Sequence, residues 1–267
     1  MRVTILVDNY LTDVKSIRHR LRGEWGFAAY LHDLKILYDT GLSGDVLLHN
    51  MRELGIDPDE PDVLVLSHRH SDHTGGVLAF LKARRRPITV YAHRLIFERA
   101  AVRDSKGEVD ISAPFDLPFL QRHGARLVAV EEPREILPGV YVSGEIPRRW
   151  GPSHVGGVSD LVRDDMALYI SSGGLVALTG CGHSGVENIV EYGLQVTGAK
   201  RLRGVVGGLH FMGLQGDRVA EAARYLASKG PELVVGTHCT GVMGVAKLAE
   251  ALGPAARVGG VGVEIDI

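Results

Sequence analysis

The histidine-rich segment His68-Arg69-His70-Ser71-Asp72-His73 constrains this chain more than any other feature of its sequence. It follows the apolar run 63–66 and precedes Gly75-Gly76, so it lies where a buried strand ends and the chain turns. Imidazoles and a carboxylate are ligands that zinc and related divalent ions accept. Without a cation, these groups beside an apolar strand would carry a desolvation cost. The segment predicts a metal site, and a histidine-rich surface loop without metal is the alternative.

The spacing within the segment predicts two neighbouring metal positions. Alternate residues of a loop that curls after a strand converge, so His68 and His70 are expected to reach one ion. Asp72 and His73 are expected to reach a second ion a few residues further on. Four residues do not complete two such sites, because each divalent ion takes about four ligands. The remaining ligands must come from other strand ends.

Three further histidines follow apolar strands and precede helical patterns: His183, His210 and His238. We predict His183 and His238 as metal ligands, and for His210 we keep three roles open: ligand, substrate contact or structural residue. The two cysteines are too few for a disulfide framework in 267 residues. Cys239 fits a small buried residue, whereas Cys181 fits a thiolate ligand, a small buried residue or a redox-sensitive group equally well.

The order of apolar segments predicts an α/β fold. Strand patterns occur in both halves, and several lead into helical patterns, such as 175–178 before a helix with a capping box at Ser184 and Glu187. This order predicts two mixed sheets packed face to face with helices outside, an αββα four-layer sandwich. We expect one domain over residues 1–267, with an insertion at about 94–124 that lies over a site.

The charge balance and hydropathy exclude several classes of protein. Thirty basic and 32 acidic residues give a net charge of −2, which does not favour nucleic-acid binding driven by positive charge. No apolar run reaches the roughly 18 to 20 residues that span a bilayer, and the N-terminus reads as a strand rather than a signal peptide. We expect a cytoplasmic protein with no nucleic-acid or membrane partner, and a homo-oligomer is left open.

The His-x-His-x-Asp-His segment, together with the following Thr74-Gly75-Gly76, resembles the signature of the metallo-β-lactamase superfamily. The resemblance implies an αββα sandwich with two divalent metal ions at the sheet edges, zinc first and manganese, iron or magnesium as alternatives. It implies that Asp39 supports the site without binding metal. It also implies the ligand set His68, His70, Asp72, His73, His183 and His238.

Further segments resemble one subgroup of that superfamily: 7–9, 26–28, 54–57, 144–148, 179–183, 207–210 and 237–241. This subgroup includes a transferase of pterin biosynthesis that joins a dihydropterin methyl diphosphate to a ribofuranosyl-aminobenzene phosphate. The resemblance implies a metal-dependent transferase with a small phosphorylated substrate. It implies Asp72 and His210 as catalytic residues, and Arg148, Glu145 and Arg69 as substrate-binding residues; for Glu145 and Arg148, a surface salt bridge is the alternative.

Two departures from the superfamily pattern keep other functions open. Cys181 stands where many superfamily hydrolases have an aspartate that bridges two metals, and Arg69 and Ser71 stand where the subgroup more often has Gly and Tyr. The first alternative is a hydrolase of a phosphodiester, lactone or thioester, in which the metals activate water and Asp72 orients it. The second alternative is a non-catalytic metal-binding or redox module. Arg69 either meets a substrate phosphate or faces solvent.

Overall fold

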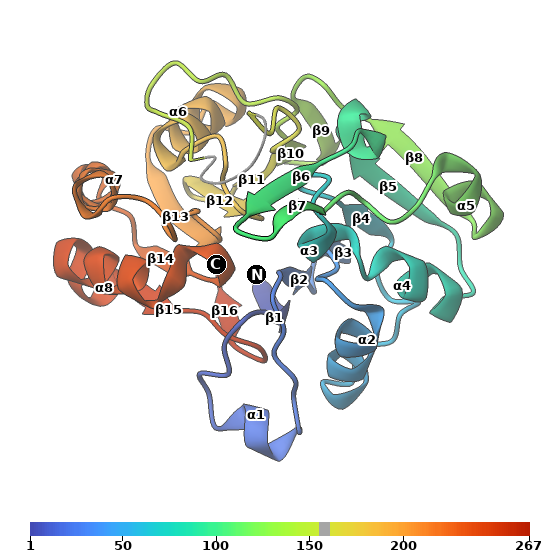
Figure 1. Ribbon diagram of the computed structural model, residues 1–267. Coiled ribbons are helices and arrows are strands. Elements are labelled where there is room, and N and C mark those ends of the chain that lie inside the picture. The colour runs from blue at the N-terminus through green and yellow to red at the C-terminus, as the bar shows by residue number, and fades with distance from the viewer. Residues whose placement is uncertain (155–160) are drawn as a thin grey trace.

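The computed structural model describes residues 1–154 and 161–267, and among them two seven-stranded sheets dominate (Figure 1). The first sheet has the order β16 (Glu264–Asp266), β1 (Arg2–Val7), β2 (Ala28–Leu31), β3 (Ile36–Tyr38), β4 (Val63–Val65), β5 (Ile88–Ala92) and β8 (Ala125–Ala129). The second has the order β15 (Ala256–Val258), β14 (Leu233–Gly236), β13 (Leu202–Gly207), β12 (Leu175–Thr179), β11 (Ala167–Ser171), β10 (Val140–Val142) and β9 (Arg134–Leu137).

Helices cover the outer face of each sheet. The described α-helices are α1 (Lys15–Arg18), α2 (Gly44–Glu53), α3 (Ser71–Thr74), α4 (Val77–Ala83), α5 (Leu117–Arg122), α6 (Val186–Thr197), α7 (Gly216–Lys229) and α8 (Gly241–Leu252). Short 3₁₀ turns are η1 (Arg94–Phe97), η2 (His238–Thr240) and η3 (Gly253–Ala255). The apolar side of α2 and α4 packs on the first sheet, and that of α6, α7 and α8 on the second. The predicted αββα sandwich is therefore confirmed.

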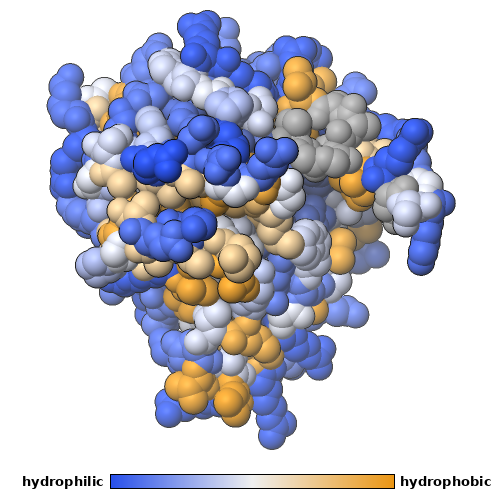
Figure 2. All heavy atoms as spheres, turned by 60° about the vertical axis from the view of Figure 1, so that its left-hand side comes forward, coloured by the Kyte–Doolittle hydropathy of each residue, from blue (hydrophilic) through white to orange (hydrophobic). Residues whose placement is uncertain are grey.

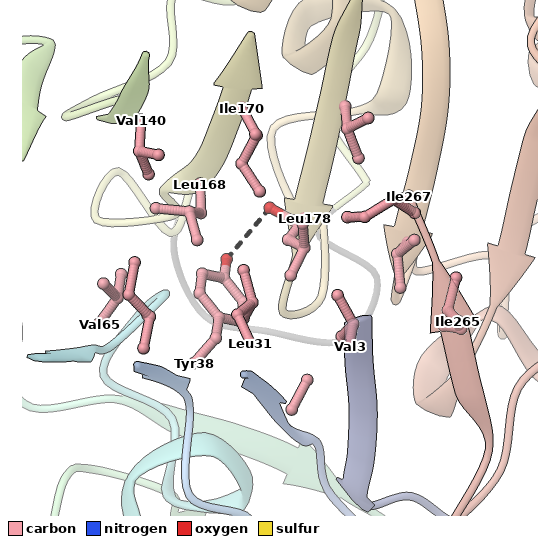
Figure 3. Close-up of a cluster of buried hydrophobic side chains, with 14 of the residues drawn as sticks. Val3, Leu31, Tyr38, Val65, Val140, Leu168, Ile170, Leu178, Ile265 and Ile267 are labelled. Atoms are coloured by element: carbon pink, nitrogen blue, oxygen red, sulfur yellow. Dashed lines mark hydrogen bonds between the residues drawn. The ribbon is translucent and has the colours of Figure 1, made fainter. Parts of the chain in front are cut away.

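The main core lies between the two sheets (Figure 3). Val3 and Val65 of the first sheet meet Leu168 and Leu178 of the second in this buried layer. Tyr38 reaches across it, and its hydroxyl donates hydrogen bonds to the carbonyl oxygens of Met166 at 3.0 Å and Leu178 at 3.4 Å. A buried tyrosine hydroxyl needs such a partner, so Tyr38 links the two layers as well as filling them.

The starts of α2 and α6 are determined in different ways. Ser43 caps α2 as its side chain accepts from Val46 N at 3.3 Å. The capping box predicted at Ser184 and Glu187 is wrong, because α6 begins after Gly185 and has no side-chain cap. Gly185 has φ +88°, and a Cβ there would lie 2.2 Å from the carbonyl oxygen of Pro152. Close packing of this loop, rather than side-chain capping, therefore determines the helix start.

The segment 94–124 contains more regular structure than its sequence indicates. It forms η1, the hairpin of β6 (Ala101–Asp104) and β7 (Gly107–Asp110), and α5. The strand β7 is exposed along its length, so it lacks the apolar alternation by which a half-buried strand is recognised in a sequence. In Figure 1 the hairpin runs across the front of the sandwich.

The N-terminal segment 8–26 leaves the first sheet after β1 and carries α1 below the sandwich (Figure 1). Apolar side chains gather at that lower end of the face drawn in Figure 2, where Val14 and Ile17 are both more than three-quarters exposed. The segment then returns through Trp25-Gly26 to the edge of the sheets. None of the helices in the described ranges combines the length and apolarity that crossing a membrane requires.

Candidate metal centre

The predicted ligands come together where strands of both sheets end. The strands β3, β4, β5 and β8 run parallel, as do β12 to β15, so their carboxyl ends lie at common edges. After β4 the chain forms the one-turn helix α3, whose N-cap is His70 and whose Thr74 hydroxyl donates to His70 O at 2.9 Å. This turn places Asp72 and His73 beside His68. Cys181 follows β12, and His238 follows β14.

Three sets of side chains bring ligand atoms within 4.8 Å of one another: Asp72, His73, Cys181 and His238; His68, Cys181 and His183; and His68, His70 and Asp72. Every predicted ligand belongs to one of them. Cys181 joins the first two sets and His68 the last two, so the sets are adjacent. His68 and His70 thus share a set that also contains Asp72, and Cys181 shares one set with His183 and another with His238.

An outer layer of polar groups orients the imidazoles. The Nδ1 partners are Ser67 Oγ for His68 at 2.9 Å, Asp39 Oδ2 for His73 at 2.8 Å, His154 O for His183 at 3.0 Å and Asn9 Oδ1 for His238 at 3.0 Å. The Asp39 carboxylate also accepts from the Ser67 backbone N–H and hydroxyl, both at 2.7 Å. Outer partners of this kind select the tautomer of ligating histidines. All four rings therefore direct Nε2 toward the centre.

The buried nitrogens at the centre test whether a metal fits. Nε2 of His183 is buried and has no hydrogen-bond partner in the described parts of the chain, and the buried Nε2 of His238 has only the Asp72 carboxylate, 3.2 Å away. Unsatisfied buried polar atoms are costly, and a cation at this point would satisfy both. Burial, reinforced by Cys239, raises the pKa of the Cys181 thiol well above its usual value, so a thiolate there needs a cation beside it. The donor set of imidazole, carboxylate and sulfur suits zinc.

Charge is distributed unevenly among the three ligand sets. Burial and the neighbouring imidazoles hold the pKa of His68 and of His183 well below 6.5, so both are neutral, as metal binding requires. Burial would also lower the pKa of His73, but Asp72 and Asp39 outweigh it and raise the value to about 9. Burial would raise the pKa of Asp72, but His73 and His238 outweigh it and lower the value. Without metal, the set of Asp72, His73 and His238 thus pairs the Asp72 carboxylate with a protonated His73 ring.

His210 lies beside the centre but outside the three sets. Its ring centroid is 4.3 Å from that of His183, and its Nδ1 has no hydrogen-bond partner within the described ranges. Burial and the nearby His154 and His238 lower its pKa to about 4, so the ring is neutral at pH 7. Its φ of +49° is uncommon for a residue other than glycine. His210 thus presents a neutral ring to the cleft beside His183 without sharing a set with the predicted ligands.

A cleft of about 570 Å³ opens onto the centre. Its floor contains His70, Asp72, Cys181, His183, His210 and His238. Apolar side chains form its walls: Trp25, Leu42, Val102, Val109, Ile111 and Met212. Three of these come from the segment 94–124. No lysine or arginine is among the described residues that line the cleft, and residues 155–160 include neither type.

The three predicted substrate-binding residues lie outside this lining. Arg69 is buried and pairs with the fully buried Asp164, whose Oδ2 also accepts from the Arg69 backbone N–H at 2.7 Å. Arg148 donates to the carbonyl oxygens of residues 161 and 162, at 2.7 and 2.9 Å. Glu145 accepts two hydrogen bonds from Arg163, each 2.8 Å long. Arg69 and Glu145 are thus paired with opposite charges and Arg148 is held by backbone carbonyl oxygens, and sequence spacing does not reveal these partners.

Several groups that complete the site were not identified from the sequence. Ser67 and Asn9 orient histidines, and Trp25 donates to Asp72 Oδ2 at 2.9 Å. Val7-Asp8-Asn9 and Gly26-Phe27-Ala28 were noted only as segments shared with a subgroup. Their position at the end of β1 and at the start of β2, at the same edge as the metal ligands, was the available signal.

Comparisons with known proteins agree with this geometry. Residues 29–193 match the family model of the metallo-beta-lactamase superfamily. The 7,8-dihydropterin-6-methyl-4-(beta-D-ribofuranosyl)-aminobenzene-5'-phosphate synthase of Methanocaldococcus jannaschii is 28% identical over an aligned length of 225 residues, and the alignment covers 78% of this chain and 76% of the relative. An uncharacterized protein of the same organism is 30% identical over 93% of this chain and 94% of its own length. The crystal structure of Tm1679, described as a metal-dependent hydrolase of the beta-lactamase superfamily, has a TM-score of 0.84 and 26% identity, covering 100% of this chain and 99% of the other.

Proposed function

The chain belongs to the metallo-beta-lactamase superfamily, and on that premise we propose that it is a metal-dependent transferase acting on a dihydropterin methyl diphosphate. The proposed second substrate is an aryl amine of the ribofuranosyl-aminobenzene type. One observation carries the proposal: the cleft combines a metal-binding floor with apolar walls that include an indole ring. Such a cleft suits a substrate with a flat aromatic body and a metal-binding group at one end.

The residues that would hold two ions follow from the three ligand sets. His68, His70 and His183 would hold the first, since His68 shares a set with each of the other two, and Asp72, His73 and His238, which share one set, would hold the second. The Cys181 sulfur shares one set with His68 and His183 and another with Asp72, His73 and His238, so it would be available as a ligand at either position. When bound, the metals supply Lewis-acid neutralisation of the leaving diphosphate. This role is needed because the described lining offers the diphosphate no cationic side chain.

The side chains around the floor provide orientation and a proton acceptor. The walls formed by Trp25, Leu42 and Met212 would hold the pterin ring and exclude water. The nucleophilic atom of the aryl amine would form a bond to the pterin methylene carbon as the carbon–oxygen bond to diphosphate breaks. The neutral His210 imidazole, with Nδ1 unpartnered among the described residues, would accept the proton that the nucleophile loses.

The relative from M. jannaschii supports the transferase because it is named as such a synthase and its match covers 78% of this chain. A hydrolase is the second candidate, and the description of Tm1679 favours it. Cys181 separates the two hypotheses, because it stands where superfamily hydrolases commonly carry an aspartate.

Metal content and substrate turnover test the proposal together. We expect inductively coupled plasma mass spectrometry to find two equivalents of zinc, manganese or iron. The metal content should fall in His183→Ala but not in His123→Ala, because His123 is the C-cap of α5 and belongs to none of the ligand sets. The metal-loaded protein should then release diphosphate from a dihydropterin methyl diphosphate only when an aryl amine is present. Release of diphosphate without amine, or cleavage of phosphodiesters instead, would support the hydrolase. Absence of bound metal after divalent ions are supplied would refute both.

A further inference from the structure

We propose that Trp25 is a positioning residue whose indole N–H orients the Asp72 carboxylate for metal binding. The inference rests on the proposed function only in requiring a metal at this centre. Nε1 of Trp25 donates to Asp72 Oδ2 at 2.9 Å. The same oxygen lies 3.2 Å from His238 Nε2 and 3.9 Å from His73 Nε2, so it is the oxygen that faces the other ligands of its set.

The indole is a suitable group for this task. A carboxylate oxygen has two lone pairs, and an indole can only donate one hydrogen bond. Trp25 therefore occupies one lone pair of Asp72 Oδ2 and leaves the other directed into the ligand set. The ring is also edge-on to His238, with centroids 5.0 Å apart and planes at 69°. It thus restrains two members of one set from the same side.

The backbone around Trp25 is fixed to the same residues. Phe27 N donates to the Asp72 carbonyl oxygen at 3.2 Å, and a Cβ on Gly26 would lie 2.4 Å from that oxygen. Gly26 N donates to Asn9 Oδ1 at 3.1 Å, and Asn9 Oδ1 lies 3.0 Å from His238 Nδ1. The segment 25–27 therefore contacts both the backbone carbonyl and the side-chain carboxylate of Asp72. Movement of the indole away from the carboxylate is limited because its own backbone is held against Asp72.

Packing alone does not explain the conformation of Trp25. Its side chain is 48% exposed in the wall of the cleft, yet its one polar atom is bonded to a metal ligand. An indole with this exposure can solvate its N–H in water instead. Outer groups that hydrogen-bond to metal ligands change metal affinity by 10- to 100-fold when removed. We therefore expect Trp25 to affect metal affinity while contributing little to the stability of the fold.

The two tryptophans of the chain provide a matched pair of variants. Trp25→Phe removes the donor and keeps an aromatic ring, whereas Trp150→Phe changes a similarly exposed indole that packs near Tyr192. Zinc affinity of the chelator-stripped full chain would be measured by competition with a chromogenic chelator. We expect Trp25→Phe to bind the weaker zinc equivalent 10- to 100-fold less tightly, with Trp150→Phe equal to wild type.

A second measurement uses the unmodified Trp25 and does not depend on the folding of its variant. In Trp150→Phe, Trp25 is the only indole, and its emission should change as zinc is added and saturate with the bound metal. Equal zinc affinity of wild type and Trp25→Phe, or emission that is unchanged at saturating zinc, would overturn the role of Trp25 while the metal site stands. Failure of wild type and Trp150→Phe to bind zinc would instead refute the proposed function, so the two failures are distinguishable.

Discussion

Arg69 permits a direct test of whether a charge in the histidine-rich segment serves substrate or fold. The Arg69 side chain is 5% exposed and that of Asp164 is 0% exposed, and the two form a buried ion pair. In Arg69→Met the Asp164 carboxylate loses its charge partner but stays in the interior. Removal of one partner from a buried pair costs about 3–5 kcal/mol. For a chain of this size that loss lowers Tm by on the order of 10 °C.

The destabilisation should depend on pH. Burial raises the pKa of Asp164 to about 6 although Arg69 opposes the shift. A carboxyl with a raised folded pKa contributes stability that is present below its unfolded pKa of about 4 and lost as pH rises through the folded value. Removal of Arg69 raises the folded pKa further, so the variant should lose more stability than wild type between pH 5 and pH 8. Urea denaturation of the metal-free protein at both pH values measures the difference.

Two controls isolate the pair. Arg69→Met/Asp164→Asn keeps an acceptor for the Arg69 backbone N–H, and we expect it to recover most of the lost stability at pH 8. Arg163→Met breaks an exposed pair with Glu145 and should cost less than about 1 kcal/mol. The reasoning would be refuted if Arg69→Met unfolded at the wild-type urea midpoint and raised only the KM for a phosphorylated substrate.

Three further predictions concern the metal centre. Asp39→Asn removes an acceptor for His73 Nδ1 and the Ser67 hydroxyl, so zinc affinity should fall 10- to 100-fold by chelator competition, with the ligands unchanged. The cobalt-loaded protein should show a thiolate-to-metal charge-transfer band that Cys181→Ala abolishes and Cys239→Ala retains; a band of unchanged intensity in Cys181→Ala would exclude the sulfur as a ligand. His210→Gln should keep full metal content and lower kcat by roughly 10²-fold or more, because it removes the proposed proton acceptor; full kcat would argue for a structural role.

Local patterns made the fold and much of the centre predictable. The αββα layering follows from the apolar strand patterns, because each sheet must bury both faces. His183 and His238 were identifiable because each follows a buried strand, and the ends of parallel strands converge at one edge. The hairpin 101–110 was not identified, because β7 is exposed along its length and carries no apolar alternation.

What the sequence determined by itself is local: the ligand types, their spacing after one strand and the strand–loop–helix order that repeats around the centre. Tertiary structure alone decided the partners of the remaining charges. Asp164 is 95 positions from Arg69, and no spacing rule connects them. In the same way, the position of Cys181 between two ligand sets and the hydrogen bond of Trp25 to Asp72 arise only when separate strand ends meet. A motif specifies what a segment can bind, whereas the packing of the sheets determines which groups orient it and which are used to stabilise the fold.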